Sequence, residues 1–467
     1  MIENGLDAAI DISYLVASIL FIVGLKFLSS PATARLGNQL AAVGMAVAVV
    51  ATMFTPGLEN HLLMVVAMAI GAVISIYAAQ TIRMTAMPQM VAVFNGTGGA
   101  ASALVAVAEY MNRNDLDRGG AVTIVLGTII GAISFTGSMV AYAKLQELIS
   151  GRPIVYPAQQ IVNAALGIGV VALSLGVVLS GDVDTGRALL VGVLVVALVL
   201  GALIVLPIGG ADMPVVIAIQ NTLTGVASIF TGLVLSNQAL VVAGLLVGAS
   251  GILLSLIMAR AMNRSLANVL FGAFGSVATG GTGDAAAGEA LPVRSVTAED
   301  AAVPLAYAER VVIVPGYGLA VAQAQHVVRE LADTLEERGV DVRYAIHPVA
   351  GRMPGHMNVL LAEANVPYDD LYEMDDINGE FSKTNVALVV GANDVTNPAA
   401  RSNPGSPIYG MPILNFDQAL QVIVRKRSMK SGCAGIETEL FHKENTSMLF
   451  GDAKESLGKL VSAVKVA

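Results

Sequence analysis

The chain has 467 residues, of which 55% are apolar and only 13% are charged, about half the charged share of an ordinary soluble domain. The net charge of −9 excludes a basic nucleic-acid surface, and the single cysteine excludes an internal disulfide framework. Of the 61 charged residues, 25 lie in residues 1–299 and 36 in residues 300–467. The first part therefore has a lipid-like composition, and the second has that of a soluble domain.

The first part contains apolar runs that are long enough to cross a bilayer. A helix rises about 1.5 Å per residue, so it needs roughly 20 residues to span a hydrocarbon core of about 30 Å. Nine such runs lie near residues 6–28, 36–55, 62–82, 88–110, 121–148, 158–180, 187–207, 213–235 and 239–259. Glu3 and Asp7 make the N-terminus acidic, whereas a signal peptide begins with positive charge. The first run is therefore expected to be a retained helix.

The charges between these runs predict the orientation of the chain, because cytoplasmic loops carry an excess of Lys and Arg. One side carries Lys26, Arg35, Arg83, Lys144, Arg152, Arg260 and Arg264. The other side carries Arg113, Arg118 and Arg187 together with several acidic residues. We therefore expect the N-terminus outside the cell and all residues after Arg264 in the cytoplasm.

Two features of the apolar runs bear on packing and function. The patterns Gly127–Gly131 and Gly244–Gly248 have two glycines four apart, which favours close contact between helices. Asn95 and Asn221 lie inside runs, and they predict either interhelical hydrogen bonds or a hydrated polar path. For Thr222 and Ser250 interhelical hydrogen bonding is the plainer explanation, and Asp212 marks either the membrane edge or part of the same path.

The sequence predicts three parts: a membrane domain over 1–262, a linker over 263–297 and a soluble domain over 298–467. Residues 275–290 are rich in Gly, Ala, Ser and Thr, which is typical of a flexible linker. Strands are predicted at 311–314, 341–346, 371–374, 387–390 and 422–424, with a helix over 320–338. This alternation predicts a parallel, doubly wound α/β domain of the Rossmann-like class.

The first of these strands leads into Gly316-Tyr317-Gly318-Leu319-Ala320-Val321 and then into the predicted helix. A strand, a Gly-x-Gly turn and a helix form the fingerprint of a dinucleotide site, because the glycines let the backbone approach a pyrophosphate. The second strand leads to Arg352 without the acidic residue typical of NAD sites. This difference favours the 2′-phosphate of NADP.

Further polar residues follow the later strands. The basic run Arg425–Arg427 with Ser428 suits a phosphate but equally suits a solvated strand end. The segment 391–398 follows a strand at the edge where ligands bind, although its Asn and Asp residues are also common turn formers. His347 and His356 are interpreted as structural, and no spacing typical of metal ligands or of a nucleophile with its base is present.

Several of these segments together resemble the beta subunit of proton-translocating nicotinamide nucleotide transhydrogenase. The resemblance is carried by residues 316–325, 347–359, 391–398 and 426–429, and Met87-Pro88 and 210–214 in the membrane part also fit. It implies that the soluble domain binds NADP(H), with the dinucleotide reversed relative to an ordinary Rossmann enzyme. Lys426, Arg427 and Ser428 would then hold the 2′-phosphate, and Arg352 would lie towards the pyrophosphate and the nicotinamide.

The resemblance also implies a set of site residues. Those expected to contact NADP(H) are Gly316, Tyr317, Gly318, Ala320, Val321, Val349, Ala350, Gly351, Arg352, Met353, Pro354, Gly391, Ala392, Asn393, Asp394, Val395, Lys426, Arg427, Ser428, Gly432, Cys433, Ala434, Gly451, Asp452 and Ala453. Those expected in coupling or proton passage are Asp394, Asn95, Asn221, Asp212, Ser250 and Gly251.

Two residues depart from the family pattern. Some members have His where this chain has Asn95, so a titratable group would come from elsewhere, such as a partner chain. Some members have Tyr where this chain has Cys433, which puts an aromatic contact with the nucleotide in doubt.

The resulting hypothesis is hydride transfer between NAD(H) and NADP(H), coupled to proton movement across a bacterial inner membrane. NAD(H) would bind a separate alpha subunit, since this chain has one nucleotide domain, and the family implies a dimer of the complex. The alternatives are a channel or transporter gated by a cytoplasmic nucleotide domain, and a membrane anchor for a dehydrogenase. Turnover with both nucleotides separates these possibilities.

Overall fold

The computed structural model of this chain describes residues 2–83, 86–113, 117–151, 153–263, 265–271, 293–353, 355–403, 406, 408–429 and 438–467. The chain divides into two compact units, Met1–Ser255 and Leu256–Ala467. Most of the predicted linker lies outside the described residues, so the three-part division stays a prediction.

Within the described ranges of the first unit and its boundary, nine helices are long and apolar enough to cross a membrane, as the sequence predicted. They are α1 (Ile2–Leu28), α2 (Pro31–Met53), α3 (His61–Thr81), α4 (Met87–Asn112), α5 (Arg118–Leu145), α6 (Gln159–Leu179), α7 (Val183–Val205), α8 (Met213–Val234) and α9 (Gln238–Ala261). The short helices η2 (Gly210–Asp212) and α10 (Leu266–Phe271) precede α8 and follow α9.

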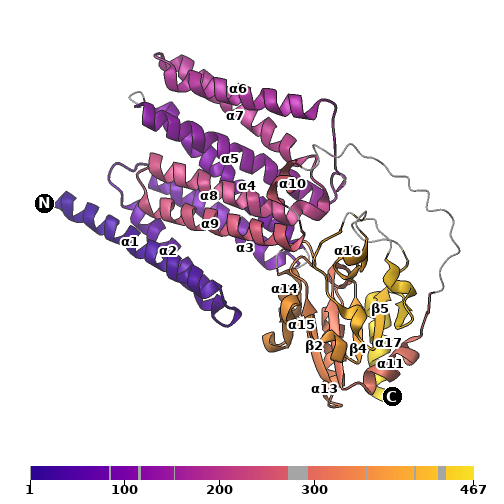
Figure 1. Cartoon of the computed structure of the whole chain (residues 1–467). Helices are drawn as coiled ribbons and strands as arrows, with labels where there is room; N and C mark the ends of the chain where they lie inside the picture. The colour runs from indigo at the N-terminus through magenta and orange to yellow at the C-terminus, as the bar shows by residue number, and fades with distance from the viewer. Residues whose placement is uncertain are drawn as a thin grey trace. The chain divides into compact units, whose positions relative to one another are not determined.

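Helix α5 lies at the centre of the helical unit, where it packs against α4, α6, α7 and α8 (Figure 1). Small residues permit these contacts, because a Cβ atom on Gly131 of α5 would lie 2.6 Å from the carbonyl oxygen of Gly99 in α4. Gly225 of α8 likewise faces Gly244 and Gly248 of α9. The predicted role of both glycine patterns in close packing is therefore confirmed.

The described part of the second unit contains six parallel strands in the order β3-β2-β1-β4-β5-β6. They are β1 (Arg310–Pro315), β2 (Asp341–Ile346), β3 (Leu371–Glu373), β4 (Val386–Val390), β5 (Gln421–Lys426) and β6 (Thr446–Phe450). In this order the chain reverses direction across the sheet between β1 and β4. Ligands of doubly wound sheets bind at that switch point, beyond the carboxyl ends of the strands.

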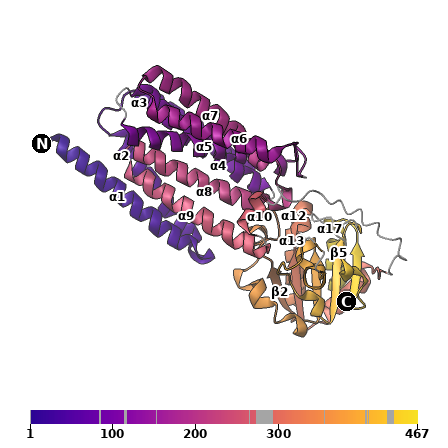
Figure 2. The same cartoon turned by 45° about the horizontal axis from the view of Figure 1, so that its top comes forward.

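Both faces of the sheet are covered, which explains the continuous apolar strands. One face packs against α11 (Ala298–Ala306), α12 (Tyr317–Ala322), α13 (Gln325–Glu336), α14 (His356–Glu363) and α17 (Ala453–Val466). Of these helices, α12, α13 and α17 are labelled beside the sheet in Figure 2. The other face packs against α15 (Met374–Ile377), η5 (Phe381–Lys383), η7 (Phe416–Gln418) and η8 (Glu439–His442). The remaining short helices are η4 (Tyr368–Asp370), η6 (Asp394–Thr396) and α16 (Ala399–Ser402).

The structure corrects two sequence-based expectations in this unit. The helix predicted over 320–338 is two helices, α12 and α13, separated at Gln323, whose backbone has a positive φ of 49°. Strand β6 was not predicted, because the polar residues Thr446 and Ser447 interrupt the apolar pattern, although the first four residues of the strand are buried. The five predicted strands are confirmed within a few residues.

Candidate functional site

The loops after β1 and β4 lie against each other at the switch point of the sheet. The backbone N–H groups of Gly316 and Gly318 donate to the carbonyl oxygens of Val390 and Gly391 at 3.0 and 2.9 Å. A Cβ atom on either Gly316 or Gly318 would collide with the backbone of Gly391 or Ala392. Only glycine allows this approach, so the predicted strand–turn–helix context of the Gly-x-Gly motif is confirmed.

The loop after β4 contains Asp394, and hydrogen bonds within the loop hold it in shape. The Asn393 amide donates to the Asp394 carboxylate at 3.1 Å, and the Thr396 hydroxyl donates to the Asn393 carbonyl oxygen at 2.6 Å. Asn397 is buried and accepts from the backbone N–H of Ala399 at 3.0 Å. These contacts show that the turn-forming role of the Asn residues is real, and that they also fix the position of Asp394.

Lys426, at the end of β5, reaches the loop after β4. Its ammonium donates to the Asn393 side-chain oxygen at 3.2 Å and lies 4.5 Å from the ring centre of Phe441. Burial lowers the pKa of Lys426, and the charge of Asp394 partly opposes this effect. The predicted phosphate-binding lysine is therefore held beside Asn393 and Asp394.

The other cations of the β5 end differ in their surroundings. Arg425 is buried and donates to the Gly451 carbonyl oxygen at 2.5 Å and to the Ser456 hydroxyl at 3.2 Å, so it holds β6 to α17. The side chain of Arg427 is 75% exposed and lies 3.7 Å from Asp452. Ser428 is also exposed. Arg427 and Ser428 are thus accessible to a ligand, whereas Arg425 is structural.

The loop after β2 packs on Tyr317. The guanidinium of Arg352 lies 4.5 Å from the Tyr317 ring centre, and the His356 ring lies 6.2 Å from it. The Arg352 backbone N–H donates to Nδ1 of His356 at 3.0 Å. Burial and the charge of Arg352 lower the pKa of His356. The Arg352 loop therefore contacts the Gly-x-Gly turn, and its place beside a bound nucleotide stays a prediction.

Some predicted site residues are placed only in part. Pro354, Gly432, Cys433 and Ala434 lie outside the described residues. Ala320 is fully buried in the core, so only its backbone could meet a ligand, whereas Val321 is 56% exposed. Gly451, Asp452 and Ala453 lie at the end of β6, where Asp452 caps α17. Among the residues that the structure describes, no group of His, Cys, Asp and Glu could hold a metal ion.

In the helical unit, polar side chains of α4, α5 and α8 meet around Asn95. The buried side-chain amide of Asn95 donates to the Ser138 hydroxyl at 2.9 Å, and the backbone carbonyl oxygen of Asn95 accepts from the Thr224 hydroxyl at 3.3 Å. The Ser134 hydroxyl lies 2.5 Å from the Thr224 hydroxyl and donates to the backbone carbonyl oxygen of Gln220 at 3.0 Å. Sequence reasoning missed Ser134, Ser138 and Thr224, although the two serines are four residues apart and share one helix face.

The other predicted path residues lie on or beside α8 and α9. Gly251 packs on Thr222, because an added Cβ atom would lie 2.6 Å from its hydroxyl oxygen. Interhelical hydrogen bonds were expected for Thr222 and Ser250, but their hydroxyls bond within their own helices. They donate to the backbone carbonyl oxygens of Ala218 and Val247 at 3.1 and 3.0 Å. Hydroxyl groups in apolar helices often form such bonds to the preceding turn.

Lys144 is a cation whose burial the sequence did not reveal. Its side chain donates to the carbonyl oxygens of Leu206 and Ile208 at 2.5 and 2.6 Å, and the residue is only 3% exposed. These carbonyls lie at the end of α7, where a cation satisfies acceptors that the helix leaves free. Lys144 therefore fixes the turn that leads into η2 and Asp212.

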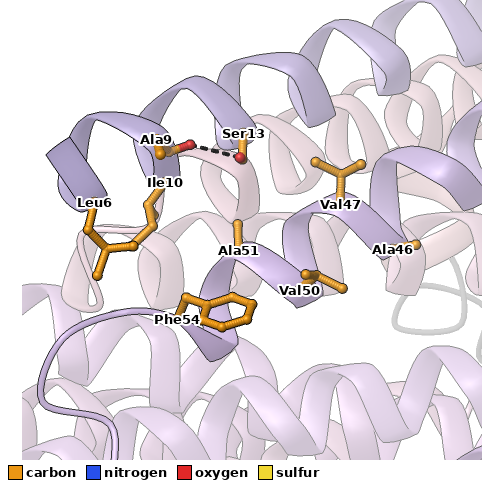
Figure 3. A pocket seen from close by; sticks show the side chains of 9 residues that line it. All are labelled: Leu6, Ala9, Ile10, Ser13, Ala46, Val47, Val50, Ala51 and Phe54. Carbon is orange, nitrogen blue, oxygen red and sulfur yellow. Dashed lines mark hydrogen bonds between the residues drawn. The ribbon is translucent and has the colours of Figure 1, made fainter.

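The helical unit also has an apolar cavity of about 380 Å³ between α1 and α2. Figure 3 shows its lining of Leu6, Ala9, Ile10, Ser13, Ala46, Val47, Val50, Ala51 and Phe54. Its one hydroxyl, that of Ser13, already donates to the Ala9 carbonyl oxygen at 2.7 Å. This cavity has no group for nucleotide or proton chemistry, so the candidate sites are the switch point and the Asn95 cluster.

Comparison with known proteins agrees with this arrangement. The family model described as NAD(P) transhydrogenase beta subunit matches residues 10–463. A Rhodospirillum rubrum protein named NAD(P) transhydrogenase subunit beta is 50% identical over 463 residues, which cover 97% of this chain and 98% of that protein. A protein of the same name from a specified strain of that species matches equally. The chain belongs to the family of NAD(P) transhydrogenase beta subunits.

Proposed function

We propose that the second unit binds NADP(H) and that the whole chain couples hydride transfer between NAD(H) and NADP(H) to proton translocation. The observation that carries this proposal is the meeting of three loops at the carboxyl ends of β1, β4 and β5. Two glycines lie there in close backbone contact, with Asp394 and Lys426 beside them. Glycine backbone and cations are the groups that a dinucleotide phosphate requires.

The residues present fit NADP(H) better than NAD(H). Lys426 and the exposed Arg427 supply positive charge for a 2′-phosphate, and Ser428 supplies a hydroxyl. The loop after β2 has no carboxylate for a ribose 2′-hydroxyl, but it has Arg352 stacked on Tyr317. Among the residues that the structure describes, the buried Nε2 of His356 beside them finds no hydrogen-bond partner, which leaves one polar atom for a ligand or a water.

The protein's part in the reaction is to position and to couple. The nicotinamide of a bound NADP(H) supplies the hydride chemistry. Arg352, Tyr317 and the Gly-x-Gly turn orient the nucleotide, while Lys426 and Arg427 select it by charge. Asp394 lies next to Lys426, so it is placed to respond to nucleotide binding.

Proton passage is proposed to use the membrane helices. Asn95, Asn221, Asp212, Ser250 and Gly251 are the proposed path residues, and the polar cluster of α4, α5 and α8 supports the part around Asn95. Proton occupancy must favour one conformation of the NADP(H) site over another, because coupling requires different affinities in two states. The NAD(H) site is proposed to lie on an alpha subunit, in a complex that dimerises in a bacterial inner membrane.

The test is a parallel titration of the full chain with NADPH and NADH in detergent. Wild-type protein should prefer NADPH by more than about tenfold, and Arg427→Ala should lose most of that preference, since a charge-assisted bond contributes roughly 1.5–3 kcal/mol. Lys454→Ala, which removes an exposed cation from the start of α17, is the control. Equal binding of NADPH and NADH by the wild type would reject the placement of the 2′-phosphate and favour the gated-channel alternative.

A further inference from the structure

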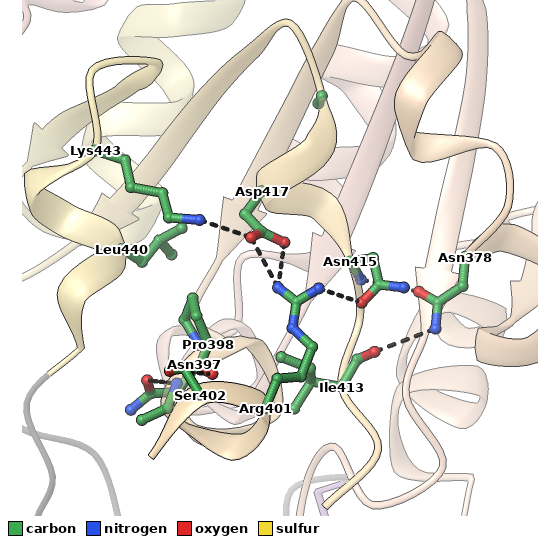
Figure 4. Close-up of polar contacts among 12 residues, drawn as sticks. Asn378, Asn397, Pro398, Arg401, Ser402, Ile413, Asn415, Asp417, Leu440 and Lys443 are labelled. Carbon is green, nitrogen blue, oxygen red and sulfur yellow. Dashed lines mark hydrogen bonds and ion pairs between the residues drawn. The ribbon is translucent and has the colours of Figure 1, made fainter.

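Asp417, in η7, binds two cations from different parts of the chain. Nη2 of Arg401 lies 2.7 and 2.8 Å from its two carboxylate oxygens, and Nζ of Lys443 lies 2.7 Å from one of them (Figure 4). The Asp417 side chain is only 9% exposed. The carboxylate is therefore shielded from water, whereas the side chains of Arg401 and Lys443 are each 39% exposed. The charges on all three groups strengthen these hydrogen bonds.

The two cations belong to the segments that follow the two loops of the proposed NADP(H) site. Arg401 lies in α16, directly after the loop that carries Asp394. Lys443 follows η8, which comes after the segment that begins at Lys426. Asp417 thus connects α16, which follows the Asp394 loop, to the end of η8 through one carboxylate.

A second set of contacts, made by Lys426, joins the Asp394 loop to η8 at the proposed NADP(H) site. Lys426 donates to Asn393, the neighbour of Asp394, and packs on Phe441 of η8. Phe441 is two residues before Lys443. A shift of η8 that breaks the Asp417–Lys443 bond would therefore also move the side chain against which Lys426 rests.

The surroundings hold Asp417 charged and Arg401 in place. Burial raises the pKa of Asp417, but the hydrogen bonds from Lys443 and Arg401 outweigh it and lower the pKa below its usual value. The Arg401 guanidinium also donates to the Asn415 side chain at 2.9 Å, and the Asn415 backbone donates to Asn378 at 2.9 Å (Figure 4). One side of the network thus reaches the end of α15, and the other reaches η8.

We infer that Asp417 is a positioning residue that holds the Asp394 loop and η8, on which Lys426 packs, in one joint arrangement, so that retention of NADP(H) depends on it. This inference rests on the proposed function, because it assigns the loops to NADP(H). Asp417 is predicted to act through Lys426 and Asp394, and it does not itself touch the nucleotide.

The first test compares Asp417→Asn, Asp417→Glu and the control Asp376→Asn in the complete enzyme with its alpha subunit. Asp376 is exposed on α15, so Asp376→Asn makes the same chemical change but leaves the hydrogen bonds of Asp417 intact. Asp417→Asn should raise the KM for NADPH about tenfold and leave the KM for NAD(H) unchanged, since only one nucleotide site is loosened. Asp417→Glu should recover part of the loss. A changed melting temperature with an unchanged KM for NADPH would overturn the inference.

A double-mutant cycle keeps the inference testable if Asp417→Asn does not fold. Arg401→Gln and Lys443→Gln should each weaken NADPH binding, but the double variant should be little weaker than the worse single variant, because both cations act through one carboxylate. Additive effects within about twofold would overturn the inference. If the wild-type enzyme does not bind NADPH, the proposed function itself fails, so the two failures are distinguishable.

Discussion

His347 is held in one neutral tautomer by two backbone groups. Its Nε2 lies 2.8 Å from the Pro412 carbonyl oxygen, which can only accept, so Nε2 carries the proton. Its Nδ1 accepts from the backbone N–H of Val349 at 3.2 Å. Protonation would place a second N–H against Val349, so this buried ring stabilises the loop after β2 only while it is neutral.

This arrangement predicts a loss of stability in mild acid. Burial lowers the pKa of His347 to about 4 from its ordinary 6.5, so the unfolded chain takes up the proton first as the pH falls below 6.5. The free energy of unfolding should fall by about 2 kcal/mol between pH 7.5 and pH 5 through this group. Thermal unfolding of the detergent-solubilised chain at both pH values measures the effect against His347→Gln, which does not titrate. Equal pH dependence in the two proteins would contradict the prediction.

The role of an individual residue could be predicted only where neighbours in the sequence determine it. The Gly316 and Gly318 motif could be interpreted from sequence, because a strand and a helix flank it within a few residues. The role of Asp417 could not be predicted, because its partners Arg401 and Lys443 are 16 and 26 residues away in the sequence. Only the folded arrangement of the strands brings them together. The burial of Lys144 could not be predicted for the same reason, because the carbonyl oxygens that it binds, those of Leu206 and Ile208, are 62 and 64 residues away, just after α7.

At the scale of helices, close contact at glycine determines how α4 and α5 pack. Gly131 faces Gly99 and Ala103 so closely that an added methyl group would lie 2.6 Å from a carbonyl oxygen and 2.9 Å from a backbone nitrogen. Helix association in lipid relies on packing of this kind, since lipid tails already surround apolar side chains. The polar cluster around Asn95 depends on the same helix pair, because Asn95 donates to Ser138 across it.

Gly131→Ala should therefore destabilise the helical unit by about 1–3 kcal/mol, which is typical of overpacking. Gly167→Ala is the matched control, because nothing lies within 4 Å of a Cβ atom added there on α6. Size-exclusion profiles and thermal midpoints of both variants in the same detergent measure the difference. Equal midpoints would show that α4 and α5 can move apart without cost.

The spans were predictable as elements because the thickness of a bilayer fixes their length, whatever their packing. Parallel strands were also predictable where they are continuously apolar, as in β1 and β4. Strand β6 was missed because its burial depends on β5 beside it, and the break at Gln323 was missed because no glycine or proline marks it.

For the whole molecule, the odd number of predicted spans predicts that residues before the first span and residues after the ninth lie on opposite sides of the membrane. The cation count favours a cytoplasmic second unit. Among the members of that count that the structure describes, Lys144 is the buried one, so it is the weakest evidence for a loop in water. Without Lys144, six cations on the predicted inner side still exceed three on the other. The orientation therefore does not depend on that residue.

This orientation can be tested with single cysteines in a Cys433→Ser background, because the chain has only one native cysteine. Glu59→Cys lies in the loop before α3, which is predicted to be outside, and Glu337→Cys lies on the surface of the second unit. A membrane-impermeant maleimide should label Glu59→Cys in intact spheroplasts and Glu337→Cys only after lysis. The reverse pattern would place the second unit outside, away from cytoplasmic NADP(H), and so would contradict both the orientation and the proposed function.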